Sequence, residues 1–288
     1  MPYFASPLFP STRTVVTIHD LIPLILPHYR GSALVRAYTQ LVATAPRRAS
    51  AIIADSECSK RDIVQHLRVD PARVHVVHLA ADARYRLCHP GEIEAVRRKY
   101  SLPDKFVLYL GGYDQRKNVR VIIQAFARLR DLHAQGFRLV LGGVMLGRDS
   151  AFFPDPRRIA RECNLPDDAV CYVGWVDEVD KPALYCGADV FVFASLYEGF
   201  GLPPLEAMAC GAPVICSNAS SLPEVVGDAG ILVDPNDVDA WAEAMRTVLT
   251  NPLKRMELAL HGVAHARKFS WKRAAEQTLA VYQSARGA

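Results

Sequence analysis

Two stretches of the sequence place charged side chains beside glycines, and the first could hold an anion. It reads F-V-L-Y-L-G-G-Y-D-Q-R-K-N at 106–118, an apolar run followed by Gly111 and Gly112, the cations Arg116 and Lys117, and a helical pattern. Backbone N–H groups and the helix dipole favour an anion between a strand and a helix. We therefore expect a diphosphate there. Taken alone, the stretch fits a tight turn with two solvated cations equally well, because no Walker or G-x-G-x-x-G motif is present.

The second stretch, S-L-Y-E-G-F-G-L-P-P-L-E-A-M-A-C-G at 195–211, carries two carboxylates around a glycine loop. Glu198 lies in the loop and Glu206 in the helix that follows. Carboxylates accept hydrogen bonds from vicinal hydroxyls, so the pair suits a ribose and a sugar. The glycines let the backbone approach a ligand, and Phe200 offers an apolar surface. Either glutamate alone is more often an exposed loop acid or a helix N-terminal charge.

These stretches lie in a chain that alternates short β-branched runs with segments of helical period, the pattern of an α/β protein with parallel strands. A first series ends in the irregular stretch 79–90, where a domain boundary is expected. The predicted strands of the first series are 14–18, 51–54 and 74–78, and its helices are 33–45 and 59–67. The predicted strands of the second series are 106–110, 138–141, 170–173, 190–194, 213–216 and 230–233; its helices include 118–133, 181–187, 204–210, 238–249 and 252–269.

The two series are unequal. Six strands make a complete doubly wound sheet, whereas the first series supplies about three. A complete half needs roughly 150 residues and only about 85 precede the boundary, which suggests a chain that starts in mid-domain. A last helix, 270–285, has Ser270 as its N-cap.

Composition excludes several classes of protein. The 288 residues are 50% apolar and 22% charged, which describes a globular chain and excludes disorder, collagen and coiled coil. The net charge is +4 and basic residues are spread along the chain, so we expect a small-molecule partner and no nucleic acid. Seven cysteines without a C-x-x-C pair predict reduced, mostly buried thiols. Neither a membrane span nor a signal peptide is predicted, so we expect a cytoplasmic location.

The sequence resembles the GT-B retaining glycosyltransferases of family 4. Glu198 and Glu206 match that family's E-x7-E motif. The resemblance continues in G-G-Y-D-Q-R-K-N at 111–118, Y-V-G-W-V at 172–176, A-L-Y-C-G-A-D-V-F-V-F-A-S at 183–195, S-S-L-P-E-V-V-G-D-A-G at 220–230 and F-S-W at 269–271. It covers essentially the whole chain from Thr14 onward.

This resemblance implies an α/β fold of GT-B type with three parts. A partial, acceptor-side Rossmann-like domain would span 1–85, and a complete nucleotide-sugar-binding domain would span 86–269. The helix at 270–288 would return to the first domain. The family's opening strand and glycine-rich turn have no counterpart in this sequence.

The resemblance also implies roles for single residues. Arg116 and Lys117 match the pair that holds the donor diphosphate and stabilises the leaving group, beside Gly111 and Gly112. Glu198 matches the acid on the donor sugar, and Glu206 the acid on the ribose.

Further roles follow from the same resemblance. The backbone of Phe200, Gly201 and Leu202 would lie near the sugar and phosphate, and the base beside 173–176. His19, in T-I-H-D at 17–20, would reach the donor sugar. Without the family, a histidine at a strand end is more often a satisfied, partly buried one.

No metal or cofactor is expected. The only D-x-D spacing, Asp237 and Asp239, is interpreted as a helix cap. The loop before the basic pair, G-G-Y-D-Q, differs from the more usual form ending in Glu-Pro. A retaining glycosidase would need its carboxyl groups about 5 Å apart, and the spacing of Glu198 and Glu206 gives no reason for that.

We therefore expect metal-independent transfer of a mannose- or glucose-type hexose, with retention, from a GDP- or UDP-sugar to a glycan or lipid-linked acceptor. The alternative is a truncated, catalytically silent nucleotide-sugar-binding subunit that needs a partner chain for the missing N-terminal segment. Peripheral membrane association stays open in both cases.

Overall fold

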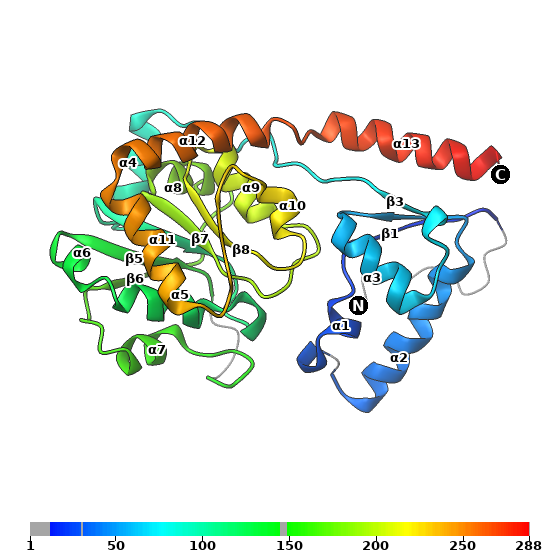
Figure 1. Cartoon of the computed structure of the whole chain (residues 1–288), viewed down its shortest axis with the longest axis horizontal. Helices are drawn as coiled ribbons and strands as arrows, with labels where there is room; N and C mark the ends of the chain where they lie inside the picture. Colours follow the sequence, from blue (N-terminus) through cyan, green and yellow to red (C-terminus); the bar gives the residue numbers. More distant parts are fainter. Residues whose placement is uncertain (1–11, 30, 145–148, 288) are drawn as a thin grey trace. The chain divides into compact units, whose positions relative to one another are not determined.

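The computed structural model describes residues 12–29, 31–144 and 149–287, which divide into two compact units. Unit 1 comprises the described residues up to Ala80, the short stretch 197–201, and the chain from Phe269 onward. Unit 2 comprises 81–196 and 202–268. Each unit has its own parallel sheet, labelled in Figure 1.

Unit 1 is built on a three-stranded parallel sheet in the order β1-β2-β3. The central strand, with sequence A-I-I-A, is buried at every position, as parallel strands covered on both faces are. The strands are β1 (Val15–Ile18), β2 (Ala51–Ala54) and β3 (Val74–Val76); the helices are α1 (Ile22–Ile25), α2 (Ala33–Thr44), α3 (Glu57–Leu67) and α13 (Trp271–Gly287).

Helices cover both faces of this sheet. On one face α2 and α3 contribute Val42, Ile63 and Leu67 to a core that includes Ile18 and Ile52. On the other face α13 places Ala274, Val281 and Ala285 against Ala51 and Ile53. The predicted cap of α13 is confirmed, because Ser270 Oγ accepts a hydrogen bond from the Arg273 N–H at 3.2 Å.

Unit 2 contains a six-stranded parallel sheet in the order β6-β5-β4-β7-β8-β9. The chain moves outward from β4 through β5 to β6, then crosses back to β7 and continues the other way. Such a reversal leaves a crevice at the carboxyl ends of the two central strands, where ligands bind in open α/β sheets. The strands are β4 (Lys105–Leu110), β5 (Phe137–Gly142), β6 (Val170–Gly174), β7 (Val190–Phe193), β8 (Val214–Ser217) and β9 (Ile231–Val233).

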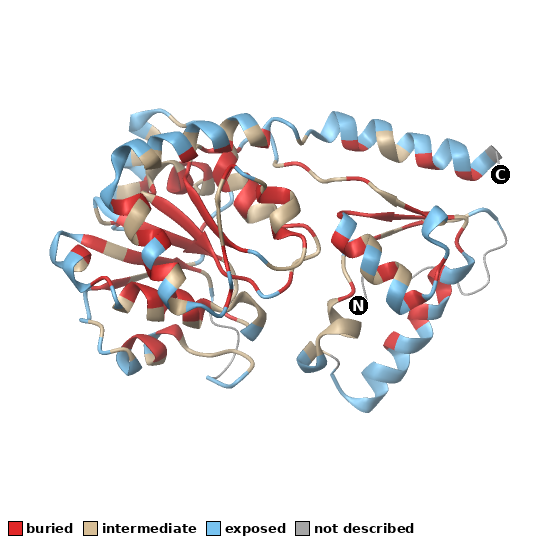
Figure 2. Ribbon diagram, viewed as in Figure 1, coloured by how far each residue is buried: buried red, intermediate tan, exposed pale blue. Residues whose placement is uncertain are grey.

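The helices of unit 2 bury the inner strands β4, β5, β7 and β8 almost completely, so that these strands are largely red and the outer helix faces pale blue in Figure 2. The edge strands β6 and β9 are mostly half-buried. The core on one face joins α5, α7 and α11 to Val107, Leu139 and Val190. The helices are α4 (Pro90–Lys99), α5 (Val119–Ala127), α6 (Arg130–Ala134), α7 (Pro156–Glu162), α8 (Lys181–Gly187), α9 (Leu202–Ala209), α10 (Leu222–Val226), α11 (Val238–Thr250) and α12 (Pro252–Ala266).

The predicted α/β class with two parallel sheets is confirmed, and the differences from prediction are local. The single helix expected at 118–133 is wrong, because Leu129 leaves helical geometry and separates α5 from α6. The apolar period continues across this break, so the sequence pattern could not show it. The helices α1, α4, α7 and α10 were not predicted, although each has a proline in its first turn, a usual sign of a helix start.

Two sequence expectations concern cysteines and membranes. All seven cysteines are free, but only three are buried and four are partly exposed, so the expectation of mostly buried thiols is wrong. None of the helices in the described ranges has the length and apolar character that crossing a bilayer requires.

Candidate functional site

Unit 2 has a cavity of about 320 Å³ at the carboxyl ends of β4, β5 and β6. Three of its walls are turns that leave these strands, and the fourth is formed by α8 and α9. Of the residues predicted from the sequence, Gly111, Gly112 and Glu206 line it together. The other lining residues are Leu110, Gly142, Gly143, Val144, Trp175, Val176, Lys181, Tyr185 and Pro203.

Glycines are required where the turns after β4 and β5 meet. A Cβ atom on Gly143 would lie 2.0 Å from the carbonyl oxygen of Gly111, far inside van der Waals contact. A Cβ atom on Gly142 would lie 2.3 Å from Leu110 Cδ2. This wall of the cavity is therefore main chain, which can present its own polar groups to a ligand.

Glu206 is a mostly buried acid at the opposite wall. It projects from α9, and the buried Tyr185 hydroxyl donates a hydrogen bond to Glu206 Oε2 at 3.3 Å. Burial raises the pKa of Glu206 above its usual value, and Lys181 and Tyr185 oppose that shift. The result is a hydrogen-bond acceptor held at the edge of a largely apolar cavity.

Sequence reasoning missed Lys181, which lines the cavity and forms an ion pair with Glu178. Nothing in the sequence distinguished it from an ordinary helix-surface lysine. Trp175, which is 66% exposed, and Val176 also line the cavity, and both fall within 173–176. The base expected beside 173–176 stays a prediction.

Arg116 and Lys117 lie further along the loop after β4 and are not among the lining residues of this cavity. They occupy a 3-10 turn (Gln115–Lys117) directly before α5, which begins at Val119, after Asn118 in a left-handed conformation. Arg116 Nε lies 3.7 Å from Asp114 Oδ1, and the Lys117 ammonium lies 5.0 Å from the Phe193 ring centre.

The Arg116 segment is tied to the end of β7. The Leu196 N–H donates a 2.8 Å hydrogen bond to the carbonyl oxygen of Arg116. The basic pair is thereby held against the strand that leads into α9, whose first residue is Leu202.

In unit 1, His19 follows β1 and pairs with an acid that sequence analysis did not single out. His19 Nδ1 lies 2.7 Å from Asp55 Oδ2; the side chain of His19 is 54% exposed and that of Asp55 only 3%. The hydrogen bond to Asp55 raises the pKa of His19. Because Asp55 holds Nδ1, the ring is oriented with Nε2 as its remaining polar atom.

The glycine loop 197–201 belongs to unit 1 and is held by the start of α3. The hydroxyls of Ser56 and Ser59 both donate to the carbonyl oxygen of Gly199, at 2.7 and 2.9 Å. A Cβ atom on Gly199 would lie 2.3 Å from the carbonyl oxygen of His19. The loop and the His19 backbone therefore pack at a distance that only glycine allows.

The side chain of Phe200 is buried and does not offer an apolar surface to a ligand, so that expectation is wrong. Its ring packs against both His78 and Phe269, with ring centres 6.0 and 5.9 Å away, and those two rings also contact each other. That the main chain of Phe200 and Gly201 lies near the sugar and phosphate stays a prediction. Gly201 has a φ of +121°, in the region that favours glycine. Glu198 is partly buried in the same loop.

The D-x-D spacing is a helix cap, as expected. Asp237 Oδ1 accepts a hydrogen bond from the Ala240 N–H at 2.9 Å at the start of α11, and Asp239 forms an ion pair with Arg128. In the described part of the chain, no group of three or more His, Cys, Asp or Glu side chains could hold a metal ion.

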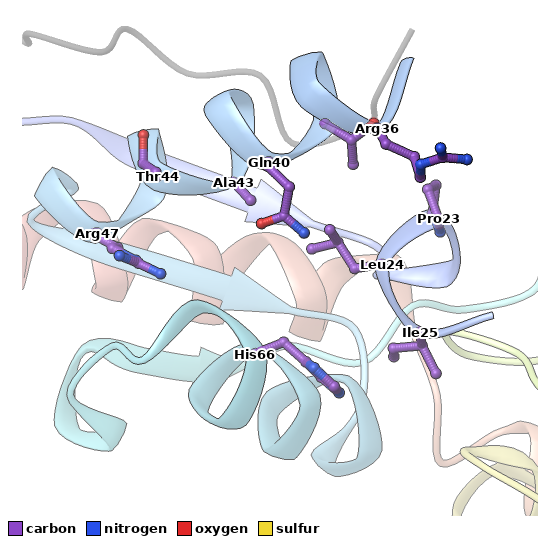
Figure 3. Close-up of a pocket in the computed structure, with 10 residues that line it drawn as sticks. Pro23, Leu24, Ile25, Arg36, Gln40, Ala43, Thr44, Arg47 and His66 are labelled. Atoms are coloured by element: carbon purple, nitrogen blue, oxygen red, sulfur yellow. The ribbon is translucent and has the colours of Figure 1, made fainter. Parts of the chain in front are cut away.

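Unit 1 also has a cavity of about 460 Å³ between α1, α2 and α3, shown in Figure 3. Arg36, Arg47 and His66 line it together with hydroxyl and amide side chains. Arg47 is fixed by a 2.7 Å hydrogen bond from its Nε to the Leu67 carbonyl oxygen. None of the residues predicted from the sequence lines this cavity.

Family models match most of the chain. The model of the glycosyl transferases group 1 matches residues 92–263, and that of glycosyltransferase family 4 matches residues 2–85.

Among similar proteins, the chain is 36% identical over 272 residues to an O-antigen chain mannosyltransferase B of Escherichia coli, covering 94% of this chain and 70% of that protein. It is 34% identical over 268 residues to a serotype-specific mannosyltransferase, WbdA, of Escherichia coli, covering 90% of this chain and 32% of that protein. The chain thus spans 70% of the first relative's length but only about a third of the second's.

Solved structures have the same architecture. Sucrose-phosphate synthase from Thermosynechococcus elongatus aligns with a TM-score of 0.75 at 26% identity, over 94% of this chain and 67% of that one. Anabaena HepE in complex with UDP and glucose aligns with a TM-score of 0.79 at 22% identity, over 94% and 72% of the two chains. The second likeness is one of fold alone.

Proposed function

Because this chain belongs to the GT-B retaining glycosyltransferases of group 1, we propose that it transfers a mannose-type hexose from a nucleoside-diphosphate sugar to a glycan or lipid-linked acceptor. The observation that carries the proposal is the cavity of unit 2, where the buried acid Glu206 faces glycine turns at the carboxyl ends of parallel strands. Mannose is favoured over glucose because the similar Escherichia coli proteins are named mannosyltransferases.

Recognition of the nucleotide would combine shape with a few polar groups. An apolar cavity with one fixed acceptor and exposed main chain suits a nucleoside, whose ribose hydroxyls donate hydrogen bonds to a carboxylate. In this proposal Glu206 holds the ribose, and Trp175 and Val176 lie beside the base. The glycine turn at 111–112 leads the diphosphate toward Arg116 and Lys117.

Transfer requires stabilisation of the leaving diphosphate as the bond to the sugar breaks. Arg116 and Lys117 would supply positive charge, the first as a planar fork and the second as a point charge. Both are already positioned by the β4–α5 loop, so little reorganisation is needed at the moment of reaction. His19, oriented by Asp55, and Glu198 would act on the donor sugar, as the family resemblance implies.

The donor is tested by calorimetric titration and thermal shift of the full chain with GDP, UDP, GDP-mannose and UDP-glucose. Ligands that bind the native state raise the melting temperature by mass action. We expect GDP and GDP-mannose to bind more tightly than UDP and UDP-glucose. Absence of any nucleotide effect at millimolar concentration would contradict the site; tighter binding of the uridine ligands would contradict only the choice of mannose.

A second function, a nucleotide-sugar-binding subunit that is silent alone, is favoured by the small sheet of unit 1. In the described residues this sheet has three strands, and β1 pairs there only with β2. Incubation with GDP-mannose distinguishes the two functions: release of GDP on adding candidate acceptors supports the transferase, whereas binding without turnover supports the subunit. The cytoplasmic location and peripheral membrane association stay predictions.

A further inference from the structure

Three cysteines from separate parts of the sequence meet in unit 2. Cys88 lies in the irregular segment before α4, Cys186 in α8, and Cys210 directly after α9. Cys186 Sγ accepts a hydrogen bond from the Cys88 N–H at 3.3 Å and lies 3.1 Å from the Cys210 carbonyl oxygen. The sulfur atoms of Cys186 and Cys88 also share one neighbour, the Arg86 carbonyl oxygen, at 3.4 and 3.7 Å.

The three thiols differ in accessibility and in the freedom of their backbones. Cys210 is 1% exposed, whereas Cys88 and Cys186 are partly exposed. Cys186 lies in α8, and the Cys210 N–H donates a hydrogen bond to the Glu206 carbonyl oxygen of α9, whereas Cys88 lies in a segment without regular structure. A disulfide requires a Cα separation of about 4.4–6.8 Å and a defined torsion, and Cys88 is the residue whose backbone can adjust to meet that requirement.

Cys186 has the surroundings of a reactive thiol. Hydrogen bonding to the Cys210 side chain, together with the N–H and thiol of Cys88, lowers the pKa of Cys186 to about 7, although burial opposes this shift. Burial raises the pKa of Cys88 to about 12. Ionisation of Cys186 gives up its S–H contacts with the carbonyl oxygens, while the Cys88 N–H stays as a donor to the thiolate. A thiolate that is partly exposed is the form that oxidants attack.

We propose that Cys186 and Cys88 form a reversible disulfide when the protein meets hydrogen peroxide. In the first step the Cys186 thiolate attacks a peroxide oxygen; the O–O bond breaks, a Cys186 sulfenic acid forms, and the departing hydroxide takes up a proton to become water. In the second step Cys88 sulfur attacks the sulfenic sulfur, the S–S bond forms, and hydroxide leaves with the Cys88 proton as a second water. One peroxide is reduced as two thiols are oxidised.

The bond would connect α8, which contributes Lys181 and Tyr185 to the lining of the cavity, to the irregular segment before α4. Cys186 directly follows Tyr185, whose hydroxyl contacts Glu206. Cys88 lies three residues after Tyr85, whose ring packs on Tyr185 with ring centres 6.1 Å apart. The disulfide is therefore a modification site adjacent to the ligand cavity, and its formation does not depend on the proposed function.

The test is peroxide treatment of the intact chain, followed by alkylation, proteolysis and mass spectrometry, with thiol titration in parallel. We expect the seven free thiols to fall by two, a cross-linked peptide that joins Cys88 to Cys186, and full recovery with dithiothreitol. Unchanged thiols, over-oxidation of Cys186 without a cross-link, or a cross-link from Cys186 to Cys210 would each overturn the proposal.

Single substitutions test whether Cys186 and Cys88 are each required for the cross-link. Cys186→Ser and Cys88→Ser should each abolish the cross-link, while Cys171→Ser, which removes another partly exposed cysteine of unit 2 in β6, should leave the loss of two thiols intact. Equal loss of the cross-link in all three variants would contradict the assignment. If Cys88→Ser does not fold, the peptide map of the unaltered chain decides the matter alone.

Discussion

At the scale of single residues, the charged groups of the candidate site differ in how far they are shielded from water. The Arg116 side chain is only 12% exposed, and Glu206 is mostly buried beside the Tyr185 hydroxyl. Partly buried charges interact more strongly with a ligand than solvated ones, but they cost stability while the ligand is absent. Two predictions follow from these opposite effects.

The first prediction concerns the basic pair. Replacing Arg116 and Lys117 together by alanine should weaken nucleoside-diphosphate binding by roughly 3–6 kcal/mol, the loss of two charge-assisted hydrogen bonds. Isothermal calorimetry measures the change. The control replaces another adjacent basic pair, the exposed Lys272 and Arg273 at the start of α13, and should leave the affinity unaltered. Equal affinity in both double variants would show that the phosphates bind elsewhere.

The second prediction concerns Glu206, whose pKa is raised by burial. A raised pKa contributes stability that is fully present below the unfolded value of 4.5 and is lost as the pH rises through the folded value. At neutral pH, which is above the unfolded value, this acid therefore lowers the stability of the fold, and Glu206→Gln should melt at a higher temperature than the unaltered chain. The difference should shrink as the pH falls toward 4.5.

Thermal melts across this pH range measure the effect of Glu206→Gln. The matched control is Glu94→Gln, because Glu94 is exposed on α4. A variant less stable than the unaltered chain at neutral pH would mean that the Tyr185 contact outweighs the cost of burial. The same variant should bind nucleotides more weakly, since an amide replaces the charged acceptor.

At the scale of elements, loops carry the site and short contacts to neighbouring elements hold the loops. The two hydroxyls of α3 on the Gly199 carbonyl oxygen, and the hydrogen bond from Leu196 to Arg116, are such contacts. They fix main chain rather than side chains, so the loops keep their conformation while their side chains stay available.

The third prediction tests the close approach of Gly199 to the His19 backbone. Gly199→Ala would place a Cβ atom 2.3 Å from the His19 carbonyl oxygen. Relief of this overlap should cost about 1–3 kcal/mol, measured by denaturant unfolding. Gly91→Ala is the matched control, because no atom lies within 4 Å of the added Cβ. Equal stability of the two variants would show that the loop moves away at no cost.

At the scale of the whole molecule, the chain has two sheets with separate cores. In unit 2 the core forms where helices pack on the six-stranded sheet. In unit 1 the last helix of the chain, α13, covers one face of the smaller sheet. The integrity of unit 1 thus depends on residues about 200 positions away from its strands in the sequence.

The fourth prediction uses two neighbouring positions of α13. Val281 is 6% exposed against the sheet of unit 1, whereas Leu279 is 55% exposed. Val281→Asp should destabilise unit 1 by more than about 3 kcal/mol because it buries an unpaired charge, and Leu279→Asp should be tolerated. Hydrogen exchange of β2 reports the loss. Unchanged protection in Val281→Asp would contradict the packing of α13 on this sheet.

The sequence by itself determined the α/β class, the two series of strands and most element bounds. These features are local: a buried parallel strand is a short β-branched run, and a helix has an apolar period with a cap such as Ser270 at its start. The glycine turns that follow strands also marked Gly111, Gly112 and Glu206, which do share a cavity.

Only the tertiary structure decided which distant residues meet. His19 and Asp55 are separated by 36 positions, and the loop 197–201 packs with unit 1 although its neighbours in the sequence belong to unit 2. The tertiary structure also decided that the ring of Phe200 is buried and that Lys181 lines the cavity. It likewise brought together Cys88, Cys186 and Cys210. Periodicity describes how a segment faces its core, but partners across the fold depend on how the elements pack, which no local pattern encodes.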